Sequence, residues 1–190
     1  MRAFVALIPP AAVLAELATA LRPVQVSHPG LRWTPAGQWH LTLAFLGEIE
    51  ESVLPDLTAR LARAARRHPP QELELSGAGR FGDRVLWTRV RGDLRALAAS
   101  VGAAARRCRI AVEDRPYRAH LTLARARPGT DLRPAVDALR DFIGTTWTAT
   151  TLHLVRSTLG AGPGGTAAHE VIATWPLGRP ALPGGQRPSA

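Results

Sequence analysis

One pentapeptide occurs twice in the sequence, and each copy carries a histidine and a threonine. The segments 40–44 and 120–124 both read His-Leu-Thr-Leu-Ala. Because side chains in a β-strand alternate between the two faces, His40 and Thr42 would share one face and the leucines the other. The second copy repeats this pattern. Each copy therefore predicts a strand that presents an imidazole and a hydroxyl on one face and anchors itself through leucines on the opposite face.

Two such faces that meet across a cleft suit the cleavage of a phosphodiester by general acid–base catalysis. An imidazole has an ordinary pKa of about 6.5, so one histidine can accept a proton from water while the other donates to the leaving oxygen. The hydroxyls of Thr42 and Thr122 would hold the non-bridging phosphate oxygens, and arginines would offset the phosphate charge without a metal. A single histidine in a strand is usually structural. Two copies with matching flanks favour a catalytic pair, His40 and His120, that needs no cofactor.

The elements around the pentapeptides follow from apolar periodicity and from the residues at their ends. Four helices are predicted, beginning at Pro10, at Ser52 as an N-cap, at Asp93 and near Asp131, the last with apolar residues through Ile143. Alternation predicts strands over 2–8, 39–46, 72–78, 85–90, 119–126, 148–157 and 169–176. Helices and strands interleave, so the class is α/β or α+β. The helix, two strands and helix between the two pentapeptides predict a duplicated half-domain, and hence two lobes.

Composition restricts the class of protein further. All 24 basic residues are arginine and the formal net charge is +9. The abundance of Ala, Arg, Gly and Pro points to codon bias as one source of the arginines, but the excess charge favours a polyanionic partner. No run approaches the roughly 20 apolar residues of a membrane span. The single cysteine, Cys108, suits a reducing compartment, and we expect a cytoplasmic protein without a membrane association.

The motifs and their flanks resemble the two-histidine (2H) phosphoesterase superfamily, and within it the RNA 2′,3′-cyclic phosphodiesterase branch long called 2′-5′ RNA ligase. The resemblance rests on the segments 39–47 and 115–125 and extends to 2–7, 85–87 and 154–160. It implies an α+β, LigT-like fold that is bilobal, with two pseudo-symmetric lobes whose antiparallel sheets line a central groove and whose helices lie outside.

The resemblance also implies boundaries and roles. One phosphoesterase domain would span 1–177, followed by a flexible Pro/Gly-rich tail over 178–190. His40 would protonate the leaving O3′ and His120 would activate water, which gives a 2′-phosphomonoester. Thr42 and Thr122 would bind the phosphate.

Two arginines beside the second motif have open roles. Arg125 matches a phosphate-contacting arginine of the family, or is a solvated charge at a strand end. Arg118 guides the RNA backbone, or is a solvated loop charge. In the loop 160–169 the sequence departs from its relatives, which often place an aromatic and a basic residue there, so substrate contacts from this loop are in doubt.

Other functions of the same fold stay open at this point. The site would also suit small cyclic nucleotides or 2′-5′ oligonucleotides, and the domain could be an RNA-binding module without chemistry. The partner expected in each case is RNA or a nucleotide, with no protein partner and a monomeric state. Simple alternation places Phe45 with the core leucines. The remaining histidines, which are His28, His68, His153 and His169, lack the spacing of zinc ligands.

Overall fold

The structure is a computed structural model that describes residues 1–162 and 165–179. Four α-helices are interspersed among its strands within these residues, together with the short 3-10 segments η1 and η2. In chain order the elements are β1 (Arg2–Leu7), α1 (Ala11–Ser27), β2 (Arg32–Trp33), η1 (Ala36–Gln38), β3 (Leu41–Glu48), η2 (Glu51–Val53), α2 (Leu54–Arg67), β4 (Gln71–Phe81), β5 (Val85–Arg91), α3 (Arg95–Arg107), β6 (His120–Arg125), α4 (Arg133–Ala138), β7 (Trp147–Ala149), β8 (Thr151–Thr158) and β9 (Ala168–Pro176).

The strands form one antiparallel path in the order β7-β4-β5-β6-β3-β1-β8-β9, with β2 added beside β6. The path is symmetric about its centre, since β6, β5 and β4 on one side match β3, β1 and β8 on the other. At the centre, β3 pairs with β6 through Leu41 opposite Leu121. The two pentapeptides therefore lie side by side on an approximate two-fold axis, whereas the sequence predicts two lobes that meet across a cleft. We call β3, β1, β8 and β9 the His40 lobe and β6, β5, β4 and β7 the His120 lobe.

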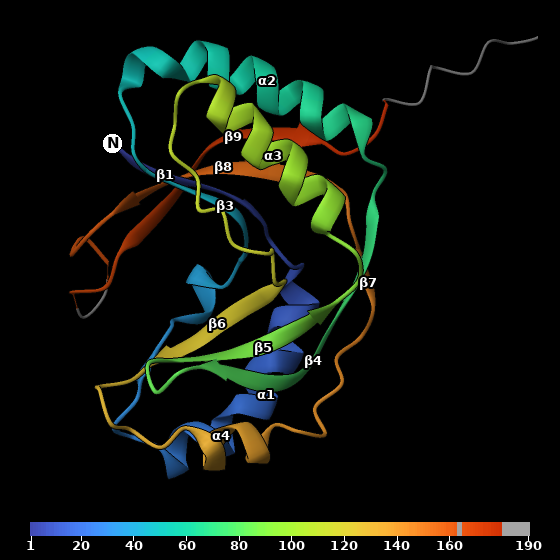
Figure 1. Cartoon of the computed structure of the whole chain (residues 1–190). Helices are drawn as coiled ribbons and strands as arrows, with labels where there is room; N and C mark the ends of the chain where they lie inside the picture. Colours follow the sequence, from blue (N-terminus) through green and yellow to red (C-terminus); the bar gives the residue numbers. More distant parts are fainter. Residues whose placement is uncertain (163–164, 180–190) are drawn as a thin grey trace, which may run out of the picture.

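The helices cross between the lobes (Figure 1). Helix α1 follows β1 of the His40 lobe but lies against the His120 lobe, where the Glu16 carboxylate accepts hydrogen bonds from the amide and hydroxyl of Thr145. Helix α3 follows β5 of the His120 lobe but packs on β3 and on α2, which in turn contacts β9. Helices α1 and α3 thus each follow a strand of one lobe and pack on the other, which ties the two lobes together.

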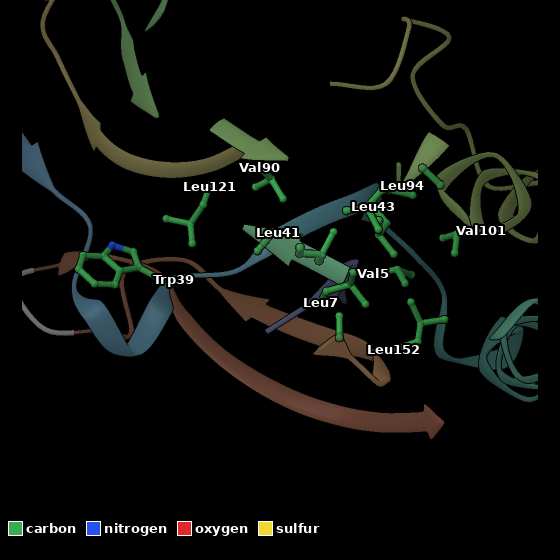
Figure 2. Packing of buried hydrophobic residues seen from close by; sticks show 14 of the residues in the cluster. Val5, Leu7, Trp39, Leu41, Leu43, Val90, Leu94, Val101, Leu121 and Leu152 are labelled. Atoms are coloured by element: carbon green, nitrogen blue, oxygen red, sulfur yellow. The ribbon is translucent and has the colours of Figure 1, made fainter. Parts of the chain in front are cut away.

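Leucines from both copies of the pentapeptide anchor the core (Figure 2). Leu41, Leu121 and Leu123 have no exposed surface, and Leu43 retains 5%. They join one continuous cluster that runs through both lobes. A second, small cluster of Phe4, Ala6 and Val155 lies apart from that core. Because Phe4 and Ala6 alternate with buried Val5 on β1, this cluster lies on the opposite face of the His40 lobe.

Three element predictions differ from the structure. Ser52 is not the N-cap of the second helix, because a 3-10 turn over Glu51–Val53 precedes α2 and Val53 takes the cap position. Helix α4 ends at Ala138, and Ile143 is 65% exposed and forms an isolated bridge with Ser76. The predicted strand 148–157 is divided into β7 and β8 at Thr150.

The end of the described chain is attached to the domain. Leu177 is buried, and the amide of Gly178 donates to the carbonyl of Ala65 at 3.0 Å. Most of the expected tail, residues 180–190, lies outside the described residues.

The central pairing gives a direct stability prediction. Leu121→Ala removes a fully buried side chain at the junction of the lobes and should lower the free energy of unfolding by about 2–5 kcal/mol. Leu159→Ala is the matched control, because that leucine is 66% exposed and its loss should change stability by less than about 0.5 kcal/mol. Urea denaturation measures both, and equal effects would contradict the packing described here.

Candidate active site

The central pair places both histidines on one face of the sheet. Leu41 lies opposite Leu121, and an antiparallel ladder continued from this pair sets His120 across from Thr42 and His40 across from Thr122. His40 and His120 are then diagonal neighbours, which in a regular ladder are about 7–8 Å apart, with their Cβ atoms somewhat closer. A phosphate group held between two imidazoles fits that separation. The paired leucines point into the core, so the opposite face carries the polar groups.

Both imidazoles are held by the same backbone contact. The Nδ1 atom of His40 lies 2.7 Å from the carbonyl oxygen of Gln38, and that of His120 lies 2.7 Å from the carbonyl oxygen of Arg118. A carbonyl only accepts, so each Nδ1 carries the proton of the neutral ring. Each Nε2 has no hydrogen-bond partner among the described residues, which leaves it available for proton transfer.

Aromatic rings fix the two imidazoles in different ways. Phe4 stacks on His40 with ring centroids 4.4 Å apart. At the other histidine, Phe81 meets His120 edge-on at 4.9 Å, and Trp87 lies 6.1 Å away. Gly79 makes room for the indole of Trp87, because a Cβ at that position would overlap the ring. The rings shield both histidines from water and restrict their orientation.

Burial lowers the pKa of both histidines. For His40 it lowers the pKa to about 4, helped by the charges of His169 and His120 and opposed by the Gln38 carbonyl. For His120 burial again lowers the pKa, with the charge of Arg118 acting in the same direction and the Arg118 carbonyl opposing it. The charge of His120 lowers the pKa of His40 because the two imidazoles lie close together. Both rings are neutral at pH 7, and an anionic ligand between them would favour protonation.

The two threonines flank the histidines as the sequence predicts. Thr42 pairs with Ala6 of β1, and Thr122 pairs with Trp87 of β5. Both side chains are half-buried, and neither hydroxyl has a hydrogen-bond partner among the described residues. Two free hydroxyls beside two free Nε2 atoms form a set of groups suited to phosphate oxygens.

Strands β3 and β6 each contain a β-bulge at the second leucine of the pentapeptide, and the bulge changes the face on which the following residues lie. Val5 pairs with Ala44 but Ala6 pairs with Thr42, so Leu43 is the extra residue on β3. Phe45 then pairs with Phe4 and is 44% exposed, with the guanidinium of Arg2 4.6 Å above its ring. The prediction that Phe45 lies in the core is therefore wrong, because the bulge interrupts the simple alternation.

The equivalent bulge at Leu123 brings Arg125 to the histidine face. Leu86 pairs with Ala124 and Val85 with Arg125, while Trp87 pairs with Thr122. Since directly paired residues share a face, Arg125 lies on the side of Thr122 and His120. It is exposed, and it forms no ion pair with the described part of the chain.

Arg118 lies beside His120, and a further arginine joins it. The carbonyl of Arg118 holds the imidazole, and its side chain is exposed. Arg89 of β5 pairs directly with His120 and is also exposed. Sequence reasoning missed Arg89 because nothing in the sequence sets the register of β5 against β6.

A third histidine also reaches the site. His169 of β9 meets His40 edge-on with ring centroids 5.2 Å apart, and it lies 5.1 Å from Phe4. Gln38 connects this strand to the site. Its side-chain amide donates to the carbonyl of Ala167 at 2.6 Å, and its backbone carbonyl holds the ring of His40. The loop 160–169 thus brings a histidine where relatives are expected to carry other residues. The contact of His169 with His40 depends on long-range strand pairing, which the sequence does not reveal.

Of the remaining histidines, His28 and His68 contact groups outside this site, whereas His153 lies on the same face as Thr42. His28 contacts the carbonyl of Val24, and His68 contacts the hydroxyl of Ser100. His153 pairs with Ala6, and burial lowers its pKa. Within residues 1–162 and 165–179, no three His, Cys, Asp or Glu side chains are grouped to hold a metal ion.

The sequence of this chain is similar to those of known proteins. Residues 9–161 match the model of the 2′-5′ RNA ligase superfamily. The chain belongs to this superfamily. A curated RNA 2′,3′-cyclic phosphodiesterase of Thermus thermophilus is 35% identical over 160 residues, which cover 78% of this chain and 76% of the relative. A protein of the same name from Geobacillus stearothermophilus is 29% identical over 80% of this chain, but the match spans only 49% of that longer relative.

Solved structures share the fold of this superfamily member. The crystal structure of TT0787 of Thermus thermophilus superposes with a TM-score of 0.74 and 32% identity, covering 93% of this chain and 98% of the other. E. coli LigT in its apo form superposes with a TM-score of 0.72 and 25% identity, covering 94% of this chain and 98% of the other. The predicted α+β, LigT-like fold is thus confirmed, with the difference that the two sheets join through the central pair. No helix within the described residues is long and apolar enough to span a membrane.

The lowered pKa of His40 predicts how stability depends on pH. The folded protein holds this histidine neutral down to about pH 4, whereas the unfolded chain protonates it near pH 6.5. Between these values the unfolded state binds more protons, so this group costs stability as the pH falls. His40→Gln should remove that loss, and the stability of the wild type relative to the variant should drop by about 3 kcal/mol between pH 7 and pH 4.

Urea denaturation at several pH values measures this difference. His153 has a lowered pKa without an interaction with His40, so its contribution is the same in both proteins and cancels in the comparison. Parallel pH curves for the two proteins would contradict the burial of His40.

Proposed function

We propose that this protein hydrolyses 2′,3′-cyclic phosphate ends of RNA to 2′-phosphomonoesters by two-histidine acid–base catalysis. One observation carries the proposal: two imidazoles with identical Nδ1 anchors leave their Nε2 atoms free on the same face of one β-ladder. The names of the relatives support the substrate class. Binding alone needs no such mirrored pair, which argues against a non-catalytic RNA-binding module.

The proposed reaction assigns one proton transfer to each histidine. Nε2 of His120 accepts a proton from water as the water oxygen attacks the phosphorus atom. The bond between phosphorus and O3′ breaks, and O3′ takes the proton from Nε2 of His40. His40 ends neutral and His120 ends protonated, and exchange with solvent restores both. The product carries its phosphate on O2′.

Two requirements of this reaction find candidates among the residues present. His40 needs a proton before it can donate, and the negative charge of a bound phosphate raises its pKa from the low value of the free site. Thr42, Thr122 and Arg125 lie on the same face and would hold the non-bridging oxygens. These groups provide charge stabilisation from the protein alone, so the proposed mechanism is independent of a metal.

The same site leaves room for two related reactions. A 5′-hydroxyl of a second strand in place of water would give 2′-5′ ligation, and the reverse reaction would cleave 2′-5′ oligonucleotides. Small cyclic nucleotides would meet the same catalytic groups. We propose a monomeric enzyme that acts on RNA ends in the cytoplasm without a protein partner.

Product analysis tests the proposal. An oligoribonucleotide with a 2′,3′-cyclic phosphate is incubated with the protein, and the position of the terminal phosphate is determined. We expect a 2′-phosphate, unchanged turnover in EDTA, and a loss of about 100-fold or more in His40→Ala and in His120→Ala. His28→Ala is the matched control, since that ring lies away from the pair and contacts the carbonyl of Val24.

Three results would contradict the proposal. A 3′-phosphate product would reverse the assignment of donor and base. Inhibition by EDTA would refute the metal-independent mechanism. Full activity in either histidine variant, with the fold intact by circular dichroism, would refute the acid–base pair.

A further inference from the structure

A pocket of about 490 Å³ opens beside His120, next to the residues that precede this histidine in the chain. Its walls come from β5, from the loop after β5 and from the segment just before β6. Trp87 and Tyr117 supply aromatic surface, and Arg89, Arg95 and Arg118 supply positive charge. The pocket borders the catalytic pair, because Arg89 is the ladder partner of His120 and the Arg118 carbonyl holds its ring.

Two of the three guanidinium groups in this pocket are uncommitted. Arg95 is bound to Asp93 through two hydrogen bonds of 3.0 and 3.1 Å, so that pair is neutral. The side chains of Arg89 and Arg118 form no ion pair or hydrogen bond with the described residues, although both are exposed and line the pocket. The charge of Arg118 acts on His120, which reflects how near it lies to the imidazole. The pocket therefore has an unneutralised positive charge next to the reacting centre.

We propose that Arg89 and Arg118 bind the phosphate on the 5′ side of the terminal nucleotide, so that the enzyme distinguishes the end of a strand from an isolated cyclic nucleoside phosphate. This inference rests on the proposed function and names the substrate feature that the site reads. Guanidinium groups match the oxygens of a phosphate in a two-pronged contact.

The distances agree with this assignment. Directly opposed residues in an antiparallel ladder have Cβ atoms about 5 Å apart, so the Arg89 side chain starts close to His120 and is long enough to reach past it. In a nucleotide only one ribose separates the 3′ phosphorus from the 5′ phosphate. A cyclic phosphate held between the two histidines therefore brings the 5′ phosphate within reach of these arginines.

Three substrates test the proposal by turnover. They are adenosine 2′,3′-cyclic phosphate with a free 5′-hydroxyl, the same compound with a 5′-phosphate, and an ApA dinucleotide with a 2′,3′-cyclic end. The wild type should show a kcat/KM on the order of tenfold to a hundredfold higher for the second and third than for the first, the gain typical of a charged hydrogen bond. The second substrate isolates a terminal phosphate and the third a phosphodiester in a strand.

Variants assign the effect to the two arginines. In Arg89→Gln and in Arg118→Gln the ratio of kcat/KM between the phosphorylated and unphosphorylated substrates should fall toward one. Arg140→Gln is the matched control, because it removes the same charge from an exposed arginine that is paired with Asp137 after α4. Its ratio should equal that of the wild type. A wild-type ratio near one, or a ratio that both pocket variants retain, would overturn the proposal.

A binding measurement separates this inference from the proposed function. Calorimetric titration compares adenosine 2′-phosphate with adenosine 2′,5′-bisphosphate, and the bisphosphate should bind at least tenfold more tightly in the wild type but not in Arg89→Gln. Equal affinities would overturn the 5′-phosphate site while leaving hydrolysis intact. A retained preference in a protein that hydrolyses none of the three substrates would overturn the proposed function and support the site.

Discussion

The antiparallel pairing of Leu41 with Leu121 is the contact on which the arrangement of the site depends. It lies on the pseudo-two-fold axis and joins the lobes into one sheet path. Because side chains alternate along each strand, burying these two leucines brings the neighbouring histidines and threonines to the opposite face. The same two strands thus complete the core and assemble the site, so fold and chemistry share one constraint.

The symmetry of the backbone contrasts with the asymmetry of the surroundings. Both pentapeptides have the same bulge and the same anchor for Nδ1, but the next residue is Phe45 in one and Arg125 in the other. His40 is stacked on Phe4 and has the third histidine beside it, whereas His120 has arginines on its flank. Aromatic rings contact both histidines, but the ladder partner of His120 is an arginine, Arg89, whereas His40 has a further imidazole, His169, beside it. Such a difference suits a pair in which one imidazole gives a proton and the other takes one.

Parts of the fold and of the site were predictable from the sequence, because they follow from local residue patterns and from the repeated pentapeptide. The two copies of His-Leu-Thr-Leu-Ala predicted the two strands β3 and β6 and the shared face of each histidine with its threonine, but not the direct pairing of these strands. The sequence did not show the register of the strands, that is, which residues of neighbouring strands pair. The bulges at Leu43 and Leu123 turn Phe45 and Arg125 to the open face, and only the pairing with β1 and β5 reveals them. Arg89 and His169 reach the histidines through long-range pairings for the same reason.

Nitrogen-15 NMR of the histidine rings tests the central claim most directly. In the free protein at pH 7, His40 and His120 should both be neutral with the proton on Nδ1, as their carbonyl contacts require. Addition of a nucleoside 2′-phosphate should then shift the Nε2 resonances of both rings together, because the proposed mechanism holds one phosphate between them. A ring protonated on Nε2 in the free protein, or a ligand that shifts only one of the two, would contradict the account.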